Sequence, residues 1–325
     1  MFIGIFLICL GVSVVLLTVF LTSKDTSTSV VTSRQPYVEP SLEKTVVDIA
    51  EKEDTTEGLE NRDLTYAHLA LSIVNYDFPS VASRQKYRAV VLVISGSGDA
   101  QYQQLYKNFK SIWKAYSTKN PNYYVIFLEC DPFASELISW SSEDQTLYLK
   151  TQDSIRPGII LKTLAGMSSA LHNIDFQYLI RTNLSTFLNW HQFDSILDEL
   201  PDYNVYAGFK NREFCSVAVT FSRDVVQKLV DHVRRNAREH YWEEWDDVFM
   251  GQIAMRNGVQ KIGINGGWFV DHADVDDKLK EKLLDATENQ KWPWFRVRNP
   301  DSHRLKVDTF IHEYLFQALY DDRTH

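Results

Sequence analysis

The sequence predicts an α/β fold in which a mixed sheet is sandwiched by helices, within a single domain at residues 64–325. Two observations support this prediction. Continuous apolar, β-branched runs such as 89–95 are typical of strands that are buried on both faces of a sheet. These runs alternate with stretches of helical spacing, and such alternation puts ligands at the carboxyl ends of the strands.

Local patterning predicts each element in turn. A short helix is expected at 66–78, where it would dock on the edge of the domain. Strands are expected at 89–95, 123–128, 145–150 and 177–182, and helices at 101–116, 158–171 and 246–256. The last helix is expected to end at Asn257-Gly258. No GxGxxG or Walker-type glycine loop follows these strands, so dinucleotide-binding and P-loop functions lose support.

The N-terminus predicts a transmembrane signal anchor at residues 1–22. No charged residue interrupts 2–22, and about 20 residues at roughly 1.5 Å each span the hydrocarbon core of a bilayer. A cleaved signal peptide is the alternative, but its apolar region is usually about 7 to 15 residues long and follows a basic start. Residues 23–63 are rich in Ser, Thr, Glu and Asp and predict a flexible, disordered stem.

Composition limits the classes of partner. The formal net charge of -9 argues against a nucleic-acid partner, because phosphate binding needs a broad basic surface. The 13% aromatic content suits the stacking of sugar rings and core packing alike. Cys130 and Cys215 could form a disulfide in an oxidising compartment or remain buried free thiols.

Several motifs follow one another in a characteristic order. They are Lys162-Thr163-Leu164 in a helix, the strand at 178–182 running into 183–189, then 205–208, 216–224, and Asp246-Asp247-Val248 with Gly251. Over roughly residues 87–270, this order resembles the GT-A glycosyltransferases of the β-1,3-galactosyltransferase and Fringe type. The resemblance implies a GT-A-like, Rossmann-like fold and a hexosyltransferase-like enzyme. Its donor would be a nucleotide-sugar such as a UDP-sugar, and its acceptor a glycan or glycoprotein.

The resemblance and the anchor together lead us to expect a single-pass, type II membrane protein with its domain in the Golgi or ER lumen. The charges beside the apolar run do not fix this orientation, because Lys24 is followed by Asp25 and nothing basic precedes the run.

One motif departs from the family. The strand that should end in an acidic DxD motif ends instead in Asn183-Leu184-Ser185, and Mn²⁺ or Mg²⁺ there would lack the charged oxygen ligands it prefers. Either basic side chains neutralise the donor's diphosphate, or the domain has lost catalysis and binds a glycan or protein partner. His272 lies where the family can carry a metal-ligating histidine, although a hydrogen-bonded surface histidine is the alternative.

The candidate donor side consists of basic and polar residues. Guanidinium groups match phosphate oxygens in geometry and charge. A structural ion pair is the alternative for Arg181, and a solvated surface segment is the alternative for the C-terminal basic cluster, which also contains Arg304 and Lys306. The donor-binding candidates are Lys162, Arg181, Asn183, Ser185, Arg296 and Arg298.

The candidate acceptor side lies at the start of the helix at 246–256. Asp247 matches the Asp of the family's acidic-Asp-Val motif and is the candidate general base, with Asp246 supporting it or exchanging roles with it. Helix capping and the helix dipole are the alternative reasons for both carboxylates. Trp242 and Trp245 could form a wall on which the acceptor stacks, or could pack in the core. A hydrolase using the same two acids is a further alternative, but the sequence offers no second carboxylate opposite them.

Overall fold

The computed structural model describes residues 56–79, 84–96, 100–211, 214–240, 242–289, 292–299 and 301–320. The chain divides into two units, 1–54 and 55–325, and all described residues belong to the second. The predicted anchor at 1–22 and most of the predicted stem at 23–63 therefore lie outside the described residues. Within the described part of the chain, no helix combines the length and hydropathy needed to cross a membrane.

Eight α-helices and eleven strands are assigned in the described residues. The helices are α3 (Thr56–Val74), α4 (Ala100–Ser117), α5 (Gly158–Asn173), α6 (Trp190–Glu199), α7 (Arg223–Asn236), α8 (Asp246–Arg256), α9 (Asp277–Glu288) and α10 (Asp301–Tyr320). The strands are β1 (Lys86–Ile94), β2 (Tyr123–Cys130), β3 (Ile138–Ser141), β4 (Thr146–Leu149), β5 (Asp175–Asn183), β6 (Thr186–Leu188), β7 (Tyr206–Asn211), β8 (Phe214–Ser222), β9 (Lys261–Gly263), β10 (Trp268–Val270) and β11 (Trp294–Val297).

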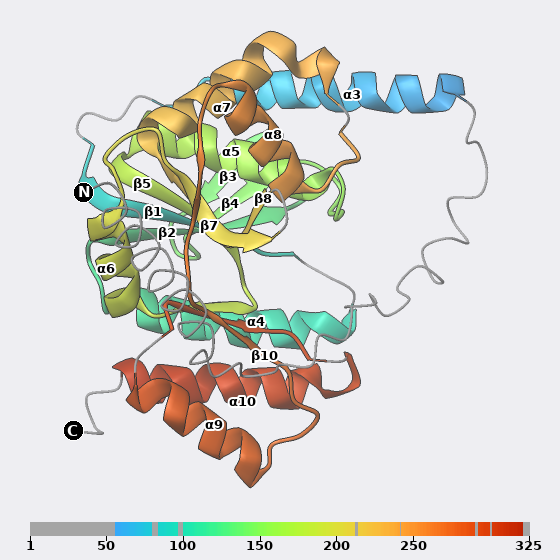
Figure 1. The fold of residues 1–325 in the computed structure, drawn as a ribbon. Coiled ribbons are helices and arrows are strands. Elements are labelled where there is room, and N and C mark those ends of the chain that lie inside the picture. The colour runs from blue at the N-terminus through green and yellow to red at the C-terminus, as the bar shows by residue number, and fades with distance from the viewer. Residues whose placement is uncertain are drawn as a thin grey trace, which may run out of the picture. The chain divides into compact units, whose positions relative to one another are not determined.

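A mixed eight-stranded sheet forms the centre of the domain (Figure 1). Its strand order is β3-β4-β2-β1-β5-β8-β7-β9. The four neighbours β4, β2, β1 and β5 run parallel, so their carboxyl ends lie at one edge of the sheet, whereas β8 is antiparallel to both β5 and β7. The predicted α/β fold with a mixed sheet between helices is confirmed.

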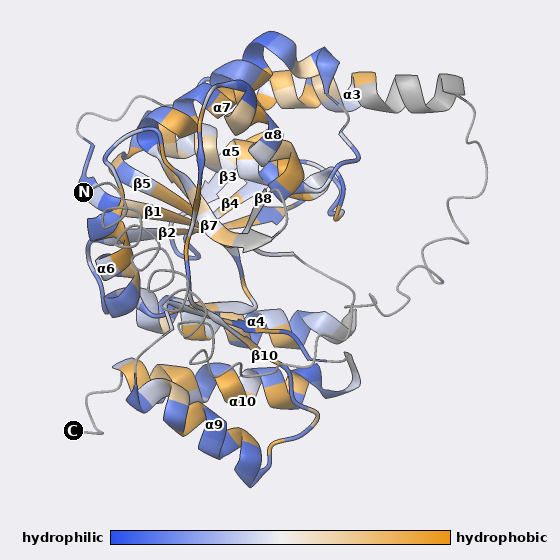
Figure 2. Ribbon diagram, in the orientation of Figure 1, coloured by the Kyte–Doolittle hydropathy of each residue, from blue (hydrophilic) through white to orange (hydrophobic). Residues whose placement is uncertain are grey.

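Alternate side chains of β1 pack into two separate hydrophobic cores. Val90 and Leu92 belong to one cluster and Val91 and Val93 to the other, because successive strand side chains point to opposite faces. This explains the continuous apolar run, which a strand needs when helices cover both of its faces. Figure 2 shows hydrophobic residues along the central strands and a mixture of hydrophobic and hydrophilic residues along the outer helices.

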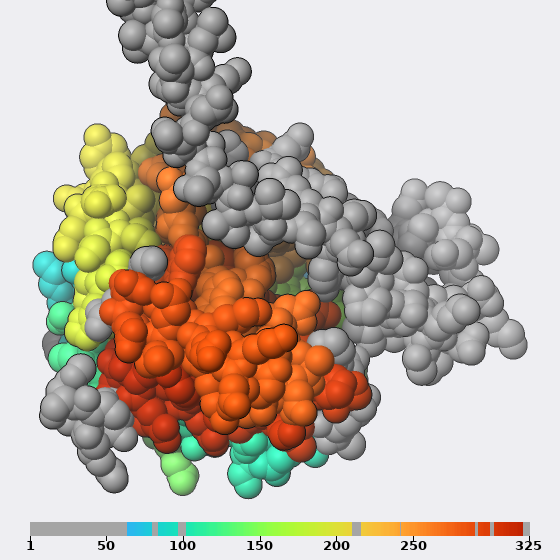
Figure 3. All heavy atoms as spheres, turned by 60° about the horizontal axis from the view of Figure 1, so that its bottom comes forward, coloured from blue at the N-terminus to red at the C-terminus, as the bar shows by residue number. Residues whose placement is uncertain are grey.

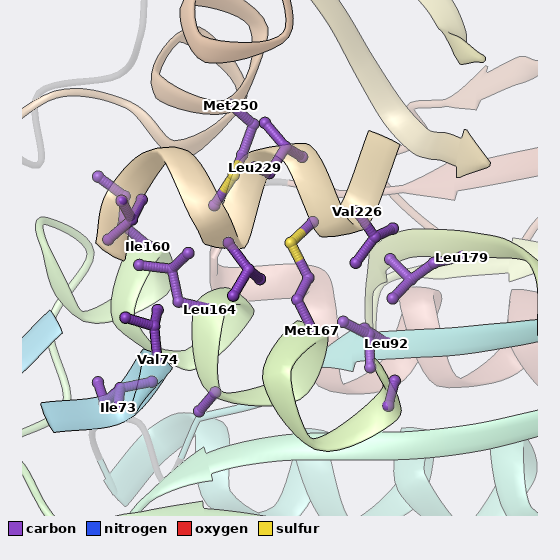
Figure 4. Packing of buried hydrophobic residues seen from close by; sticks show 14 of the residues in the cluster. Ile73, Val74, Leu92, Ile160, Leu164, Met167, Leu179, Val226, Leu229 and Met250 are labelled. Atoms are coloured by element: carbon purple, nitrogen blue, oxygen red, sulfur yellow. The ribbon is translucent and has the colours of Figure 1, made fainter. Parts of the chain in front are cut away.

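The two faces are covered by different elements. Helices α3, α5, α7 and α8 cover one face, and Figure 4 shows their mainly aliphatic side chains packed together, among them Leu164 of α5 and Leu229 of α7. Helices α4, α6, α9 and α10 lie on the other face with a small sheet of order β10-β11-β6. Because β6 follows β5 after only Leu184 and Ser185, the small sheet begins at the carboxyl edge of the large one.

Element boundaries agree closely where the sequence signal is strong. Helix α8 runs from Asp246 to Arg256, and Gly258 follows it with a φ of 73°, as predicted. Helix α3 differs from its prediction, since it begins at Thr56 and therefore extends into the predicted stem, and it ends at Val74 rather than at residue 78.

Candidate functional site

Arg181 and Asp246 come together from distant parts of the chain. Arg181 lies near the carboxyl end of β5, Asp246 opens α8, and Arg181 Nη2 forms an ion pair with Asp246 Oδ2. Both side chains are about nine-tenths buried, and burial raises the pKa of Asp246 while the Arg181 charge opposes that rise. The structural ion pair considered for Arg181 is therefore present, and it fixes the start of α8 against the end of β5.

Asp247 has a different environment from its neighbour. Its side chain is half-buried, and Asp247 Oδ1 accepts a hydrogen bond of 3.0 Å from the backbone N–H of Val248. No cation pairs with Asp247 among the described residues. Its remaining lone pairs can accept a proton or a hydrogen bond from a ligand, whereas Asp246 is committed to Arg181.

The Asn183-Leu184-Ser185 turn is held rigidly between the two sheets. Leu184 N–H donates to Ile94 O at 3.2 Å, and Leu184 O accepts a bond of 3.1 Å from the buried indole of Trp113. Ser185 O accepts from the N–H of Val297 at 2.8 Å. With its backbone fixed by β1, α4 and β11, the turn presents Asn183 and Ser185 in a defined position.

Arg296 reaches this turn from β11. Its Nη1 donates to Asn183 Oδ1, to Ser185 Oγ and, at 3.4 Å, to Thr186 Oγ1. The contact follows from the strand pairing, because Arg296 lies directly opposite Thr186 in the β11–β6 ladder. A guanidinium thus contacts the polar side chains of the turn that follows β5.

Arg296 carries its charge in an unfavourable environment. Burial above all, together with the nearby cations Arg298, Arg181 and Arg304, lowers its pKa to about 9, while Asp308 opposes this shift. No carboxylate forms an ion pair with Arg296 in the described part of the chain. An anion bound beside it would relieve this repulsion, since an opposite charge favours the ionised form.

The residues at this turn do not fit a divalent metal ion. Asn183 Oδ1 and Ser185 Oγ already accept from Arg296, and a hard cation prefers carboxylates to neutral amide and hydroxyl oxygens. No group of three His, Cys, Asp or Glu side chains suited to a metal occurs among the described residues. His272, the candidate metal ligand, has Nδ1 3.1 Å from Asp274 O and Nε2 3.7 Å from an Asp276 oxygen, and its side chain is only 16% exposed.

Lys162 lies at the same sheet edge in a closed network. Its Nζ is buried and donates to Ser95 O at 2.8 Å and to Asp153 Oδ1 at 2.7 Å. Lys162 therefore joins the end of β1 to the loop before α5, and its charge is already paired. Cys130, which ends β2, is a buried free thiol whose pKa burial raises to about 12.

The two candidate acceptor tryptophans differ in exposure. Trp242 is fully buried, donates its indole N–H to Ala237 O at 3.1 Å and packs on Phe249, so it occupies the core position considered as its alternative. Trp245 is 42% exposed and is the residue immediately before α8. The Arg156 guanidinium lies 4.7 Å from the centre of its ring.

Two of the other basic residues in the C-terminal cluster are paired with carboxylates. Arg304 pairs with the buried Asp308 at 2.9 Å, and Lys306 pairs with Asp274 at 2.6 Å on the surface. Arg298 is exposed, two residues beyond Arg296 on the same segment. Arg296 therefore contributes the direct contact with the Asn183 turn, and Arg298 contributes positive charge nearby.

Sequence analysis missed two residues at the site. Thr186 accepts from Arg296, and Arg156 stacks on Trp245. Thr186 directly follows the Asn183-Leu184-Ser185 motif, so its hydroxyl could have been included. Nothing in the local pattern around Arg156 indicates its contact with Trp245, which depends on how the loop before α5 approaches α8.

Comparison with known proteins gives distant similarities. No protein-family model and no curated protein matches the chain. The bifunctional glycosyltransferase WbbM is similar with a TM-score of 0.34 and 12% identity over 68% of this chain, which spans only 46% of that protein's chain. Mouse xyloside xylosyltransferase 1 is similar with a TM-score of 0.32 and 9% identity, over 65% of this chain and 97% of that one. Both are distant structural resemblances to glycosyltransferases.

Proposed function

We propose that the chain is a membrane-anchored glycosyltransferase that moves a sugar from a nucleotide-sugar donor, such as a UDP-sugar, to a glycan or glycoprotein acceptor. The observation that carries the proposal is the contact of Arg296 with Asn183 and Ser185, beside the Arg181–Asp246 pair. It supports an anion site at the carboxyl edge of a largely parallel sheet, where α/β proteins bind their ligands.

The donor's diphosphate would bind to side-chain cations. Arg296 lacks an ion-pair partner among the described residues, and the exposed Arg298 adds charge at the same place. Arg181 Nε is buried without a hydrogen-bond partner in the described part of the chain, although its Nη2 is paired. Guanidinium groups bind phosphate oxygens through paired, charge-assisted hydrogen bonds, so these groups suit a diphosphate without a metal.

Asp247 would act as the general base. The acceptor hydroxyl oxygen attacks the anomeric carbon of the donor sugar, and its proton passes to Asp247. The bond between the anomeric carbon and the phosphate oxygen breaks, and its electron pair leaves with the nucleoside diphosphate. Arg296 would stabilise the negative charge that develops on this leaving group. Asp246 would keep Arg181 in position rather than accept a proton.

A non-catalytic domain that binds a glycan or protein partner is the second candidate. The lack of carboxylates in Asn183-Leu184-Ser185 favours it, because the resemblance links those carboxylates to donor binding. The two candidates share the anion site and differ at Asp247, which only the enzyme needs as a base.

A donor screen tests the proposal. The full-length chain in detergent micelles would be incubated with individual UDP-sugars and glycan acceptors, and UDP release would be measured with excess EDTA and with added Mn²⁺. Release that survives EDTA is the expected result. Strict dependence on Mn²⁺ would contradict donor binding by side chains. An absence of UDP release with every donor would contradict the enzyme and favour the non-catalytic domain.

Membrane anchoring has a separate test. If residues 2–22 are retained as an anchor, the protein should fractionate with membranes and should need detergent for release. A mature N-terminus between Ser23 and Ser33 would indicate cleavage and contradict the anchor.

A further inference from the structure

A cavity of about 350 Å³ lies between β10 and α9. Trp268 and Trp292 line it with half-buried rings, and Val270, Leu279 and Ala286 provide a buried apolar floor. The surrounding face of the molecule is formed by the C-terminal segments that include α9 and α10 (Figure 3). The volume is near the lower end of the range of about 300 to 1,000 Å³ for small-molecule sites.

The small sheet separates this cavity from the candidate donor site. Phe269, Arg296 and Thr186 are aligned across β10, β11 and β6, so their side chains share one face. Trp268 and Val270 flank Phe269 in β10 and therefore point to the opposite face, toward α9. The cavity and the Arg296 guanidinium are thus on opposite faces of one sheet.

Close packing positions the Trp268 ring. Gly266 and Gly267 precede it with φ values of 93° and 118°, a region that suits glycine. A Cβ on Gly267 would lie only 2.0 Å from the Trp294 ring, so the backbone there approaches the core closely. Trp268 also makes an edge-to-face contact with Phe295, with ring centres 6.0 Å apart. The wall of the cavity is therefore largely preformed.

The chemistry of the lining indicates a ligand that is apolar on its faces and polar at its edges. Neither indole N–H of Trp268 and Trp292 has a hydrogen-bond partner in the described part of the chain, so both can donate to a ligand. At the rim, Asp271 and Lys282 are exposed and without an ion pair among the described residues, and the Asp285 carboxylate accepts a bond of 2.9 Å from Asn289.

We propose that this cavity binds a neutral saccharide of one or two pyranose rings. The C–H face of a pyranose packs on an aromatic ring, while its hydroxyl groups can donate to the carboxylates of Asp271 and Asp285 and accept from Lys282 and the indoles. Two carboxylates against one ammonium group disfavour phosphate and acidic sugars. This site goes beyond the proposed sugar transfer and does not depend on it.

Binding of two defined disaccharides tests the site. Lactose and chitobiose would be titrated separately into the full-length chain in detergent, without nucleotide-sugar, and followed by saturation-transfer NMR and tryptophan fluorescence. At least one should bind, and Trp268→Ala and Trp292→Ala should each weaken its binding by about tenfold or more. Because no donor is present, a lack of glycosyl transfer would leave this result unchanged.

Matched variants separate a binding site from a general effect on folding. Trp140→Ala is the control, since Trp140 is 45% exposed on β3 at the far edge of the large sheet, and it should leave binding unchanged. Asp271→Asn tests the exposed rim without altering the core, and it should weaken binding while the melting temperature stays the same. The proposal would be overturned if neither disaccharide bound, or if Trp268→Ala and Trp292→Ala proteins that melt normally bound as well as the unaltered chain.

Discussion

The proposed donor and acceptor sides of the candidate site are built in different ways. The acceptor side begins one helix, α8, so its two carboxylates are adjacent in sequence and in space. The donor side combines the turn after β5 with Arg296 of β11, which meet only because β6 and β11 pair. The proposed acceptor side has two adjacent carboxylates, whereas the proposed donor side has a guanidinium in contact with the polar turn. Positive charge there is therefore supplied by the chain itself.

The largest expected effect is on the acceptor side. Asp247→Asn retains the size of the side chain and removes its basic lone pair, so turnover should fall about 10²-fold to 10⁴-fold while donor affinity stays nearly constant. The measurements are UDP release and equilibrium binding of the donor.

Asp277→Asn is the matched control for Asp247→Asn. Asp277 is also in the first turn of a helix, and its side chain is 92% exposed on α9, so turnover should not change. Full turnover in a folded Asp247→Asn protein would show that Asp247 is not the general base. The proposed acceptor side would then have no catalytic role to set against the donor side.

The next effect concerns the contact that joins the two sides. Asp246→Asn leaves the Arg181 charge buried without its partner, and breaking one partner of a buried ion pair costs about 3 to 5 kcal/mol of unfolding free energy. Asp247→Asn should cost only about 0.3 to 1 kcal/mol, the usual contribution of a first-turn carboxylate. Urea unfolding of both variants measures this difference.

A double variant identifies the cause of the Asp246 effect. Asp246→Asn combined with Arg181→Met removes both charges, so the double variant should recover part of the stability that Asp246→Asn loses. Losses that simply add would show that the two side chains do not stabilise each other. Asp246 would then be an ordinary first-turn residue like its neighbour.

The sequence predicts the acceptor side better than the donor side for a physical reason. Acidic residues in the first turn and a glycine after the last turn mark a helix locally in the sequence, and α8 begins and ends at the predicted residues. The strands β6, β10 and β11 have only three or four residues each, which leaves little pattern to recognise, and all three were missed. Arg296 was a candidate from its charge alone, but its contact with Asn183 depends on pairing between those short strands.

Burial distinguishes residues that the sequence treats as equivalent. Trp242 and Trp245 were both acceptor candidates, yet only Trp245 is exposed. Asp246 and Asp247 share the same helix turn, yet only Asp246 has a buried cation partner. In each case the difference arises from what packs against the side chain, and that depends on tertiary structure rather than on local spacing.

Arg296 provides the corresponding test of the donor side. Arg296→Met keeps much of the side-chain length and removes the charge, so donor affinity should fall by about 1.5 to 3 kcal/mol, as expected for the loss of a charge-assisted hydrogen bond. Turnover at saturating donor should fall less than in Asp247→Asn. Isothermal titration with the donor in EDTA measures the affinity. Arg235→Met is the control, because Arg235 is exposed on α7, and an equal loss there would indicate a general charge effect.

The smallest expected effect is at Trp245. Its exposed ring is adjacent in sequence to Asp246 and is stacked by Arg156, so it can form one wall for an acceptor sugar beside Asp247. Trp245→Ala removes that stacking surface, and a sugar–aromatic contact worth roughly 0.5 to 1 kcal/mol would correspond to a rise of about twofold to fivefold in the KM for the acceptor. Donor affinity should not change, because in the proposed function the donor binds to guanidinium groups on the other side. Trp140→Ala removes a tryptophan of similar exposure at the far edge of the sheet and should alter neither constant. A change in donor affinity with Trp245→Ala, at an unchanged acceptor KM, would assign Trp245 to the donor side and would contradict its place on the acceptor side.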